Sequence, residues 1–332
     1  MKELSFNRGL SDALKIAVAL VVAVHHYYYG YRTVVPDAFP IIFDVSGKIG
    51  SCGLGIFFFF SGYGLMESER RKPLVTFGDF VKRRLMKIYI PVLLVTSLWL
   101  LFFLPQLLPP PSSWMQALKF AGEILSMLLW KFSDAALWFI RSLLQLYFVF
   151  FVFVKLLRKN RLKSAWTVIV AGTLLVYLIK CISNEYQSIA IPFFSIGVFA
   201  SCYKSKIWHG LHISLLPMAV CLIGALLLHN DPTISELLIP NYLFMMCLIF
   251  VCTNFKPELP TVPLLGALSF DIYLVHNKIS DYVFGFLCRE ISIWQFALLT
   301  LVLAGILYFL RSKVMHYFEN WCNRQGNAKR IN

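Results

Sequence analysis

The chain has 332 residues, of which 58% are hydrophobic and 14% are charged, and its mean hydropathy is +0.69. Soluble domains carry roughly 25% charged residues, so this composition excludes an ordinary soluble fold. It favours a polytopic α-helical membrane protein, because each spanning helix requires about 20 apolar residues.

The formal net charge of +14 does not indicate nucleic-acid binding. The basic residues lie between apolar runs, which is typical of membrane topology. The 30 Phe residues are spread through the runs and form no basic stacking surface. The eight Cys residues are scattered singly, without the spacing of a zinc site or a disulfide framework. We therefore expect contact with membrane lipids, no nucleic-acid partner and no metal site.

Apolar runs long enough to span a bilayer recur along the whole chain. They fall at about 11–30, 47–66, 88–108, 136–157, 163–182, 187–203, 210–229, 236–254, 262–286 and 292–311. Pro192 and Pro240 interrupt the sixth and eighth runs, but neighbouring helices can satisfy the backbone groups that a proline frees. The sequence therefore predicts an all-α polytopic membrane protein with about ten transmembrane helices. Residues 1–311 would form the transmembrane domain, and residues 312–332 a basic cytoplasmic tail at the membrane surface.

The first run is expected to remain a transmembrane helix rather than a cleaved signal, because Lys15 interrupts it and bulky His and Tyr residues follow. Residues 114–131 are apolar but include Lys119 and Glu123, which favours a helix in the membrane interface, with a re-entrant segment as the alternative. If ten spans alternate from a cytoplasmic N-terminus, most of the 31 Lys and Arg residues fall in cytoplasmic segments. The positive-inside rule therefore predicts that both termini are cytoplasmic.

Lys15 and His26 lie eleven residues apart in the first run. At 100° per residue, they fall within about 20° of each other on one helix face, about 16 Å apart along it. Ionisable groups inside a membrane cost about 2.5–3.5 kcal/mol or more, so this pairing favours a functional role, and imidazole is suited to proton transfer. The alternative is that Lys15 extends to the headgroups while the His residues cap a helix end. His25 points about 100° away from His26 and is the weaker candidate.

Three further runs each carry polar residues. The second combines glycines with four consecutive Phe residues and Ser61; the glycines allow close helix packing, whereas Ser61 is a candidate to line a polar cavity. At the start of the third run, Arg84 and Lys87 lie one turn apart on one face, either as a phosphate site at the cytoplasmic mouth or as a positive-inside anchor. In the fourth run, Arg141 and Gln145 share a face near the external end, where a role in a cavity competes with extension to the headgroups.

The ninth run has two polar faces. Ser269, Tyr273 and His276 follow the i, i+4, i+7 spacing of one helix face. Asp271 and Lys278, seven residues apart on another face, are placed to neutralise each other. A structural hydrogen-bond network is the alternative to a functional site here.

Together these segments resemble the acyltransferase-3 family of bacterial membrane acyltransferases. That family has a basic residue followed after ten residues by a His, a Gly- and Phe-rich second span, a basic pair before a Pro at the third span, and a Ser-aromatic, Tyr-Leu-x-His segment near its end. The matching positions, in family order within residues 8–278, are Lys15 and His26, Gly53–Gly64, Arg84, Lys87 and Pro91, and Ser269–His276; Trp138–Tyr147 is also similar. Lys15 and Lys87 stand where the family commonly has Arg, which keeps the charge but loses the bidentate fork.

The resemblance implies transfer of an acyl group from cytoplasmic acetyl-CoA to a sugar hydroxyl. The group would most often be acetyl, and the acceptor a cell-surface carbohydrate or its lipid-linked precursor. The enzyme would lie in a bacterial cytoplasmic membrane and span it several times. Acetyl-CoA would act as a substrate, and no cofactor is expected to be tightly bound.

This chemistry gives each candidate residue a role. A sugar hydroxyl is a poor nucleophile and needs a base, for which we expect His26. His276, Tyr273 and Ser61 are candidates to support the acceptor or the developing oxyanion, with His276 and Tyr273 counted as catalytic. The expected substrate-binding residues are Lys15, Arg84, Lys87, Ser61 and Arg141, the first three for the phosphate and pantetheine end of CoA.

Two other classes of function remain open from the sequence. A proton-coupled transporter or flippase also uses intramembrane His, Asp and Lys residues. Transporters often show inverted repeats, and no internal repeat is evident in this chain. A non-catalytic membrane scaffold is disfavoured by the Lys15 and His26 pairing.

Overall fold

The computed structural model describes residues 6–36, 38–73, 76–107, 111–128, 137–156, 186–203, 232–254 and 258–331. These residues form helices and short connections, as an all-α membrane protein requires. The helices are α1 (Arg8–Val34), α2 (Pro40–Arg71), α3 (Phe77–Phe80), η1 (Val81–Leu85), α4 (Met86–Leu107), α5 (Trp114–Ser126), α6 (Trp138–Leu156), α8 (Tyr186–Tyr203), α10 (Pro232–Asn254), α11 (Pro263–Ser280), η4 (Asp281–Phe286) and α12 (Ile293–Ile331).

Most of the expected spans correspond to helices. The runs expected at 163–182 and 210–229 lie outside the described residues, and each of the others overlaps a described helix. Pro192 and Pro240 lie inside α8 and α10 and do not end them. Within the described part, four helical segments are long and apolar enough to cross a membrane, and the total of ten spans stays a prediction. The four are Arg8–Val34, Pro40–Arg71, Phe77–Phe102 and Ile293–Cys322.

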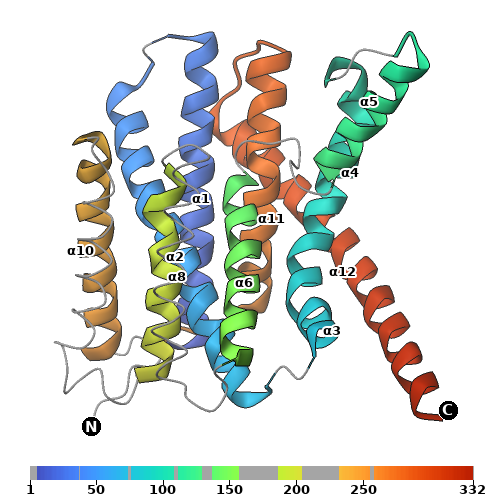
Figure 1. Ribbon diagram of the computed structural model, residues 1–332. Helices are drawn as coiled ribbons and strands as arrows, with labels where there is room; N and C mark the ends of the chain where they lie inside the picture. The colour runs from blue at the N-terminus through green and yellow to red at the C-terminus, as the bar shows by residue number, and fades with distance from the viewer. Residues whose placement is uncertain are drawn as a thin grey trace.

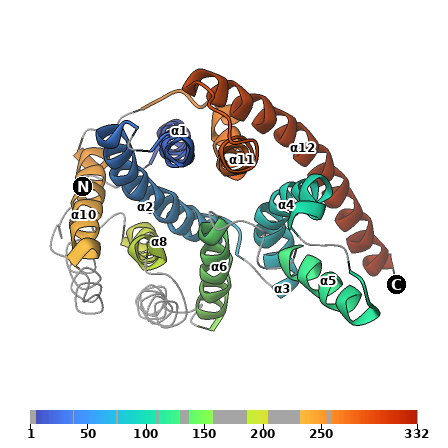
Figure 2. The same ribbon diagram turned by 90° about the horizontal axis from the view of Figure 1, so that it is seen from above.

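The helices form a bundle around α1 and α2 (Figure 1). Helix α1 packs between α2 and α11, α2 packs against α8, and α12 runs along α11 and α4. Viewed from above, α12 borders one flank of the bundle and α10 the opposite flank (Figure 2). Helix α1 begins and α12 ends at the same end of the bundle (Figure 1), as expected for termini on one side of a membrane. The assignment of that side to the cytoplasm remains a prediction.

Glycines bring α2 and α8 into backbone contact. A Cβ atom added to Gly62 would clash with the carbonyl oxygen of Phe194, and one added to Gly197 would clash with the carbonyl oxygen of Phe59. Small residues permit such a close approach of membrane helices. At the end of these helices, Arg70 donates to the carboxylate of Glu67 at 3.2 Å and to a backbone carbonyl of α8 at 2.8 Å. The packing expected for the glycine-rich second run is therefore present.

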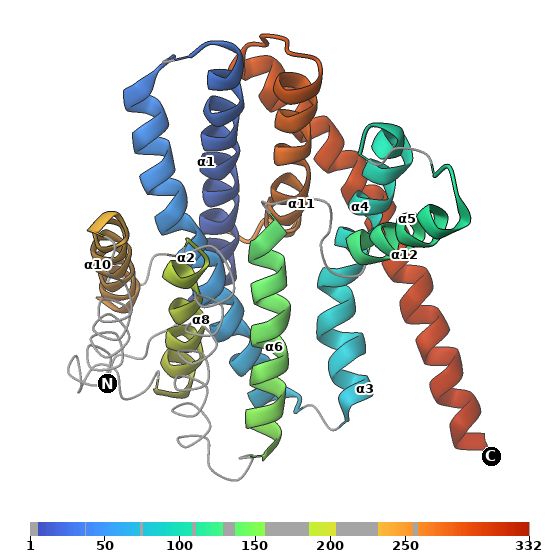
Figure 3. The ribbon, with the colours of Figure 1, turned by 45° about the horizontal axis from the view of Figure 1, so that its top comes forward.

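The flank formed by α4, α5 and α12 is apolar and exposed. Helix α12 has 39 residues, a length of about 58 Å, and it diverges from the bundle towards its C-terminus (Figure 3). Trp294 and Leu298 on α12, and Trp114 and Leu118 on α5, are each more than 60% exposed. Such a surface suits contact with lipid. The expected tail begins within α12, and the helix continues through it to Ile331.

Candidate functional site

His26 and His276, which are 250 positions apart in the sequence, meet at the interface of α1 and α11. Their ring centroids lie 4.9 Å apart with the ring planes at 61°, an edge-to-face contact. The Ser280 hydroxyl donates to the backbone carbonyl of His26 at 2.9 Å. A Cβ atom on Gly30 would clash with the side chains of Ser280 and Phe284, so the two helix backbones approach closely here. The expected base and one of its expected helpers are therefore in contact.

The hydrogen bond of His276 determines which ring nitrogen carries its proton. Nδ1 lies 3.1 Å from the carbonyl oxygen of Ile272. Because a carbonyl oxygen can only accept, Nδ1 carries the hydrogen and Nε2 presents a lone pair. Nε2 is buried and has no hydrogen-bond partner in the described part of the chain, and the residue is 0% exposed. His276 thus holds an unused proton acceptor beside the ring of His26, which is only half-buried.

Tyr273 completes this group on α11. Its ring centroid lies 5.5 Å from that of His276 and 5.3 Å from that of Phe139 on α6. Phe57 on α2 borders the same ring at 6.3 Å. We refer to His26, His276 and Tyr273 as the histidine cluster. All three residues predicted to be catalytic lie in it, between α1, α2, α6 and α11.

His25 borders the histidine cluster, because its ring meets that of His26 edge to face at 5.6 Å, but its other contacts are with α2. Its ring stacks on Phe43 at 5.2 Å, and its Nδ1 lies 3.5 Å from the Ser46 hydroxyl. The guanidinium of Arg32 covers the ring of Phe43 at 4.7 Å. These contacts connect α1 to α2 and give His25 a packing role.

Lys15 is paired within its own helix. Its ammonium lies 3.8 Å from the carboxylate of Asp12, which Arg8 approaches at 3.7 Å. The Lys15 side chain is 31% exposed and also lies over the ring of Phe60 at 5.9 Å. Asp12 is a residue that the sequence analysis missed. Its position three residues before Lys15 is the signal that identifies it, because such residues are neighbours on a helix.

Arg84 and Lys87 turn to different helices. Arg84 lies in the π-helical segment η1 and donates to the Ser68 hydroxyl on α2. Lys87 lies 3.9 Å from Glu319 on α12, in an ion pair in which both side chains are 57% exposed. A π-turn uses more residues than an α-turn and so rotates the side chains that follow it. The shared face expected for this pair assumed a continuous α-helix, and the structure does not show it.

Ser61 and Arg84 belong to one polar cluster through Tyr147, which the sequence analysis did not single out. The side chain of Ser61 hydrogen-bonds Tyr147 of α6, and the phenol of Tyr147 interacts electrostatically with Arg84. Nε of Arg84 is buried without a hydrogen-bond partner among the described residues. Arg141, the remaining predicted binding residue, is half-buried near the start of α6. Two of the expected binding residues, Ser61 and Arg84, are therefore brought close together.

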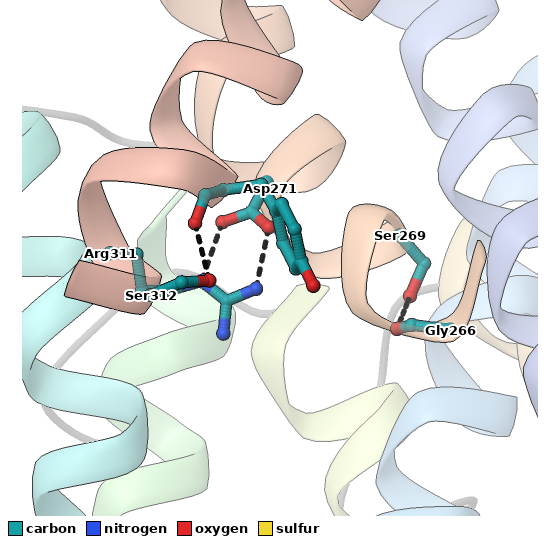
Figure 4. Close-up of polar contacts among 6 residues, drawn as sticks. Gly266, Ser269, Asp271, Arg311 and Ser312 are labelled. Atoms are coloured by element: carbon teal, nitrogen blue, oxygen red, sulfur yellow. Dashed lines mark hydrogen bonds and ion pairs between the residues drawn. The ribbon is translucent and has the colours of Figure 1, made fainter. Parts of the chain in front are cut away.

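Asp271 has a partner that the sequence analysis did not anticipate. Arg311 of α12 binds its carboxylate through two hydrogen bonds of 3.0 and 2.7 Å (Figure 4). Lys278, the expected partner, lies with its ammonium over the ring of Trp99 on α4 at 4.7 Å. The spacing of seven residues places Asp271 and Lys278 on one face of α11, but the cation that binds Asp271 comes from α12.

Comparison with known proteins identifies the family. A family model described as an acyltransferase domain matches residues 11–311, which include every residue of the histidine cluster. No curated protein and no solved structure matches the chain. The match covers most of the chain and includes the segments from Lys15 to His276 that carry the resemblance. The chain therefore belongs to the acyltransferase-3 family of membrane acyltransferases.

Proposed function

We propose that this protein is a membrane O-acyltransferase that moves an acetyl group from acetyl-CoA to a hydroxyl of a cell-surface carbohydrate or of its lipid-linked precursor. The observation that carries the proposal is the contact between His26 and His276, with Tyr273 beside them. Two imidazoles from distant parts of the chain meet inside a bundle where ionisable groups are costly. Their chemistry is that of proton transfer.

The reaction requires a base and a path for the proton. The acceptor hydroxyl attacks the thioester carbonyl, a C–O bond forms, the C–S bond breaks and CoA leaves as the thiolate. His26 takes the hydroxyl proton because it is the more exposed of the two histidines. His276 stabilises the resulting imidazolium through its free Nε2 lone pair. The proton then returns to the CoA thiolate.

Arg84 is the best placed of the cationic candidates to hold the donor. It is only partly paired within the described residues, and it faces the interior of the bundle beside Ser61 and Tyr147. Lys15 lies in the N-terminal half of α1. It is about 16 Å from His26 along the helix axis, a gap that the extended arm of CoA can bridge. Lys87 faces α12 and contributes less.

The proposed donor and acceptor imply where the protein lies in the cell. We propose a multi-pass protein of the bacterial cytoplasmic membrane, with the ends of α1 and α12 on the cytoplasmic side. Acetyl-CoA is a substrate, and no cofactor is held between turnovers. Arg141, near the opposite end of the bundle, is a candidate for binding the acceptor.

Acetyl-CoA binding and cleavage by the purified protein test this proposal. We expect acetyl-CoA and CoA to raise the melting temperature, as a ligand of the folded state does. Arg84→Ala should lose that stabilisation, whereas His26→Ala should keep it and lose thioester cleavage. His25→Ala is the matched control, because it removes the neighbouring imidazole, which stacks on Phe43 and has no proposed catalytic role. Flux of a glycan across vesicles without thioester consumption would contradict the proposal and favour a flippase.

A further inference from the structure

Outside the histidine cluster, α11 carries a second buried polar contact, the ion pair of Asp271 with Arg311. The Asp271 side chain is 0% exposed and that of Arg311 is 18% exposed. Nε of Arg311 donates to Oδ1 at 3.0 Å and Nη2 donates to Oδ2 at 2.7 Å (Figure 4). The guanidinium also lies over the ring of Tyr308 at 5.3 Å. This is the two-point fork that Arg forms with a carboxylate.

A fork of this kind restricts how α11 is oriented against α12. A single hydrogen bond tolerates rotation, whereas two parallel bonds fix the plane of the carboxylate against that of the guanidinium. A buried carboxylate without its cation is strongly unfavourable, so the two helices cannot separate or slide without a large cost. Lys278 adds a contact from the same face of α11 to Trp99 of α4.

Asp271 and His276 are connected through one rigid helix. They lie five residues apart, which places them about 140° apart around the axis and about 7.5 Å apart along it. Asp271 faces α12, and His276 faces α1. Ile272, which follows Asp271 in the chain, supplies the carbonyl that fixes the tautomer of His276. A rotation of α11 that broke the ion pair would therefore also shift the ring of His276 from His26.

We propose that Asp271 and Arg311 are positioning residues for acyl transfer. Their ion pair holds α11 at the rotation in which the ring of His276 contacts that of His26. The pair does not contact the reacting groups and acts through His276. This role rests on the proposed function of the histidine cluster, but the position of His276 can be measured without any turnover.

The test combines histidine mapping with kinetics on the full-length protein in detergent. Diethyl pyrocarbonate modifies exposed, unprotonated imidazoles, and peptide mass spectrometry reports each His separately. In the wild type, His276 should be protected, and the exposed His316 should serve as the internal standard. Asp271→Asn should raise the modification of His276 severalfold relative to His316. It should also lower kcat for acetyl-CoA cleavage by about 100-fold, with little change in KM, as expected for a misplaced catalytic group.

Three further variants separate positioning from general stability. Arg311→Lys keeps the charge but loses the fork, and we expect an intermediate effect on both readouts. The double variant Asp271→Leu/Arg311→Met removes both charges, so it should fold but still expose His276. Ser312→Ala is the matched control, because among the described residues the Ser312 hydroxyl donates to the carbonyl of Tyr308 on its own helix, and it should behave as the wild type.

Specific outcomes would overturn the proposal. If the double variant keeps a protected His276 and wild-type kcat, the loss in Asp271→Asn comes from an uncompensated charge and not from positioning. Unchanged protection of His276 in Asp271→Asn would also overturn it. If the wild type cleaves no acetyl-CoA but Asp271→Asn exposes His276, the positioning of α11 stands and the proposed function fails.

Discussion

The histidine cluster and the cationic residues at the other end of the bundle were predicted with the same kind of reasoning, but the structure treats them differently. His26, His276 and Tyr273 come from two helices and meet. Lys15, Arg84 and Lys87 pair with Asp12, Ser68 and Glu319, on three different helices. Tyr273 and His276 lie in one regular helix and contact each other, whereas Arg84 lies in a π-turn and contacts another helix than Lys87 does. We therefore expect the residues of the histidine cluster to act together in the reaction, and the three cationic residues to contribute independently of one another.

Removing one histidine of the cluster should have the largest effect. His276→Ala is expected to lower the rate of acyl transfer by about 10²–10⁴-fold, the usual contribution of a general acid–base group. Thioester cleavage in purified protein measures this loss. His25→Ala should lower the rate much less, because the ring of His25 stacks on Phe43 and lies beside Ser46 and has no proposed part in proton transfer, although its edge meets the ring of His26. An equal loss in both variants would mean that the cluster is not distinct from its surroundings.

The close contact between α2 and α8 can be tested with two glycines of α2. Gly62→Ala forces a Cβ atom against the backbone of α8, whereas no atom of the described residues lies within 4 Å of a Cβ atom at Gly64. We expect Gly62→Ala to destabilise the fold by about 1–3 kcal/mol, the cost of overpacking. Thermal unfolding followed by Trp fluorescence measures the difference. Gly64→Ala should unfold as the wild type does, and a shared decrease in Tm would argue against the close α2–α8 contact.

Arg84 should matter for donor binding more than for chemistry. Arg84→Ala is expected to raise KM for acetyl-CoA by about tenfold, the loss of one charge-assisted contact, with a smaller change in kcat. Steady-state kinetics at saturating acceptor separate the two constants. A fall in kcat at constant KM would instead place Arg84 in the reaction step.

The smallest effect is expected for Lys87. Its ion pair with Glu319 is more than half exposed on both sides, and such pairs contribute below about 1 kcal/mol. Lys87→Ala should therefore change KM for acetyl-CoA much less than Arg84→Ala does. Similar KM values for the two variants would restore the shared phosphate site that the sequence alone predicted.

The membrane class and the polar face of the ninth run could be predicted from the sequence because both depend on local regularities. Apolar runs define spans, and the i, i+4, i+7 spacing placed Tyr273 and His276 on one face. The resemblance assigned His26, Tyr273 and His276 to one reaction, and the structure shows the contact between His26 and His276. The match of the acyltransferase family to residues 11–311 confirms that resemblance.

The parts that sequence reasoning missed depend on tertiary contacts. Arg311 ends an apolar run, where a basic residue normally extends to the headgroups, yet it turns inward to Asp271. Only the packing of α11 on α12 selects this partner over Lys278. Similarly, the π-turn before α4 has only five residues, too few to show a periodicity in the sequence. Arg84 lies in this turn and contacts α2.

A double-mutant cycle on His26 and His276 tests the central claim most directly. Rates of acetyl-CoA cleavage would be measured for the wild type, each Ala variant and the double variant. If the two imidazoles act as one proton-transferring unit, the double variant should be no slower than the slower single variant, because groups that act together are not additive. Losses that multiply would show that the two histidines work independently, and would contradict this account.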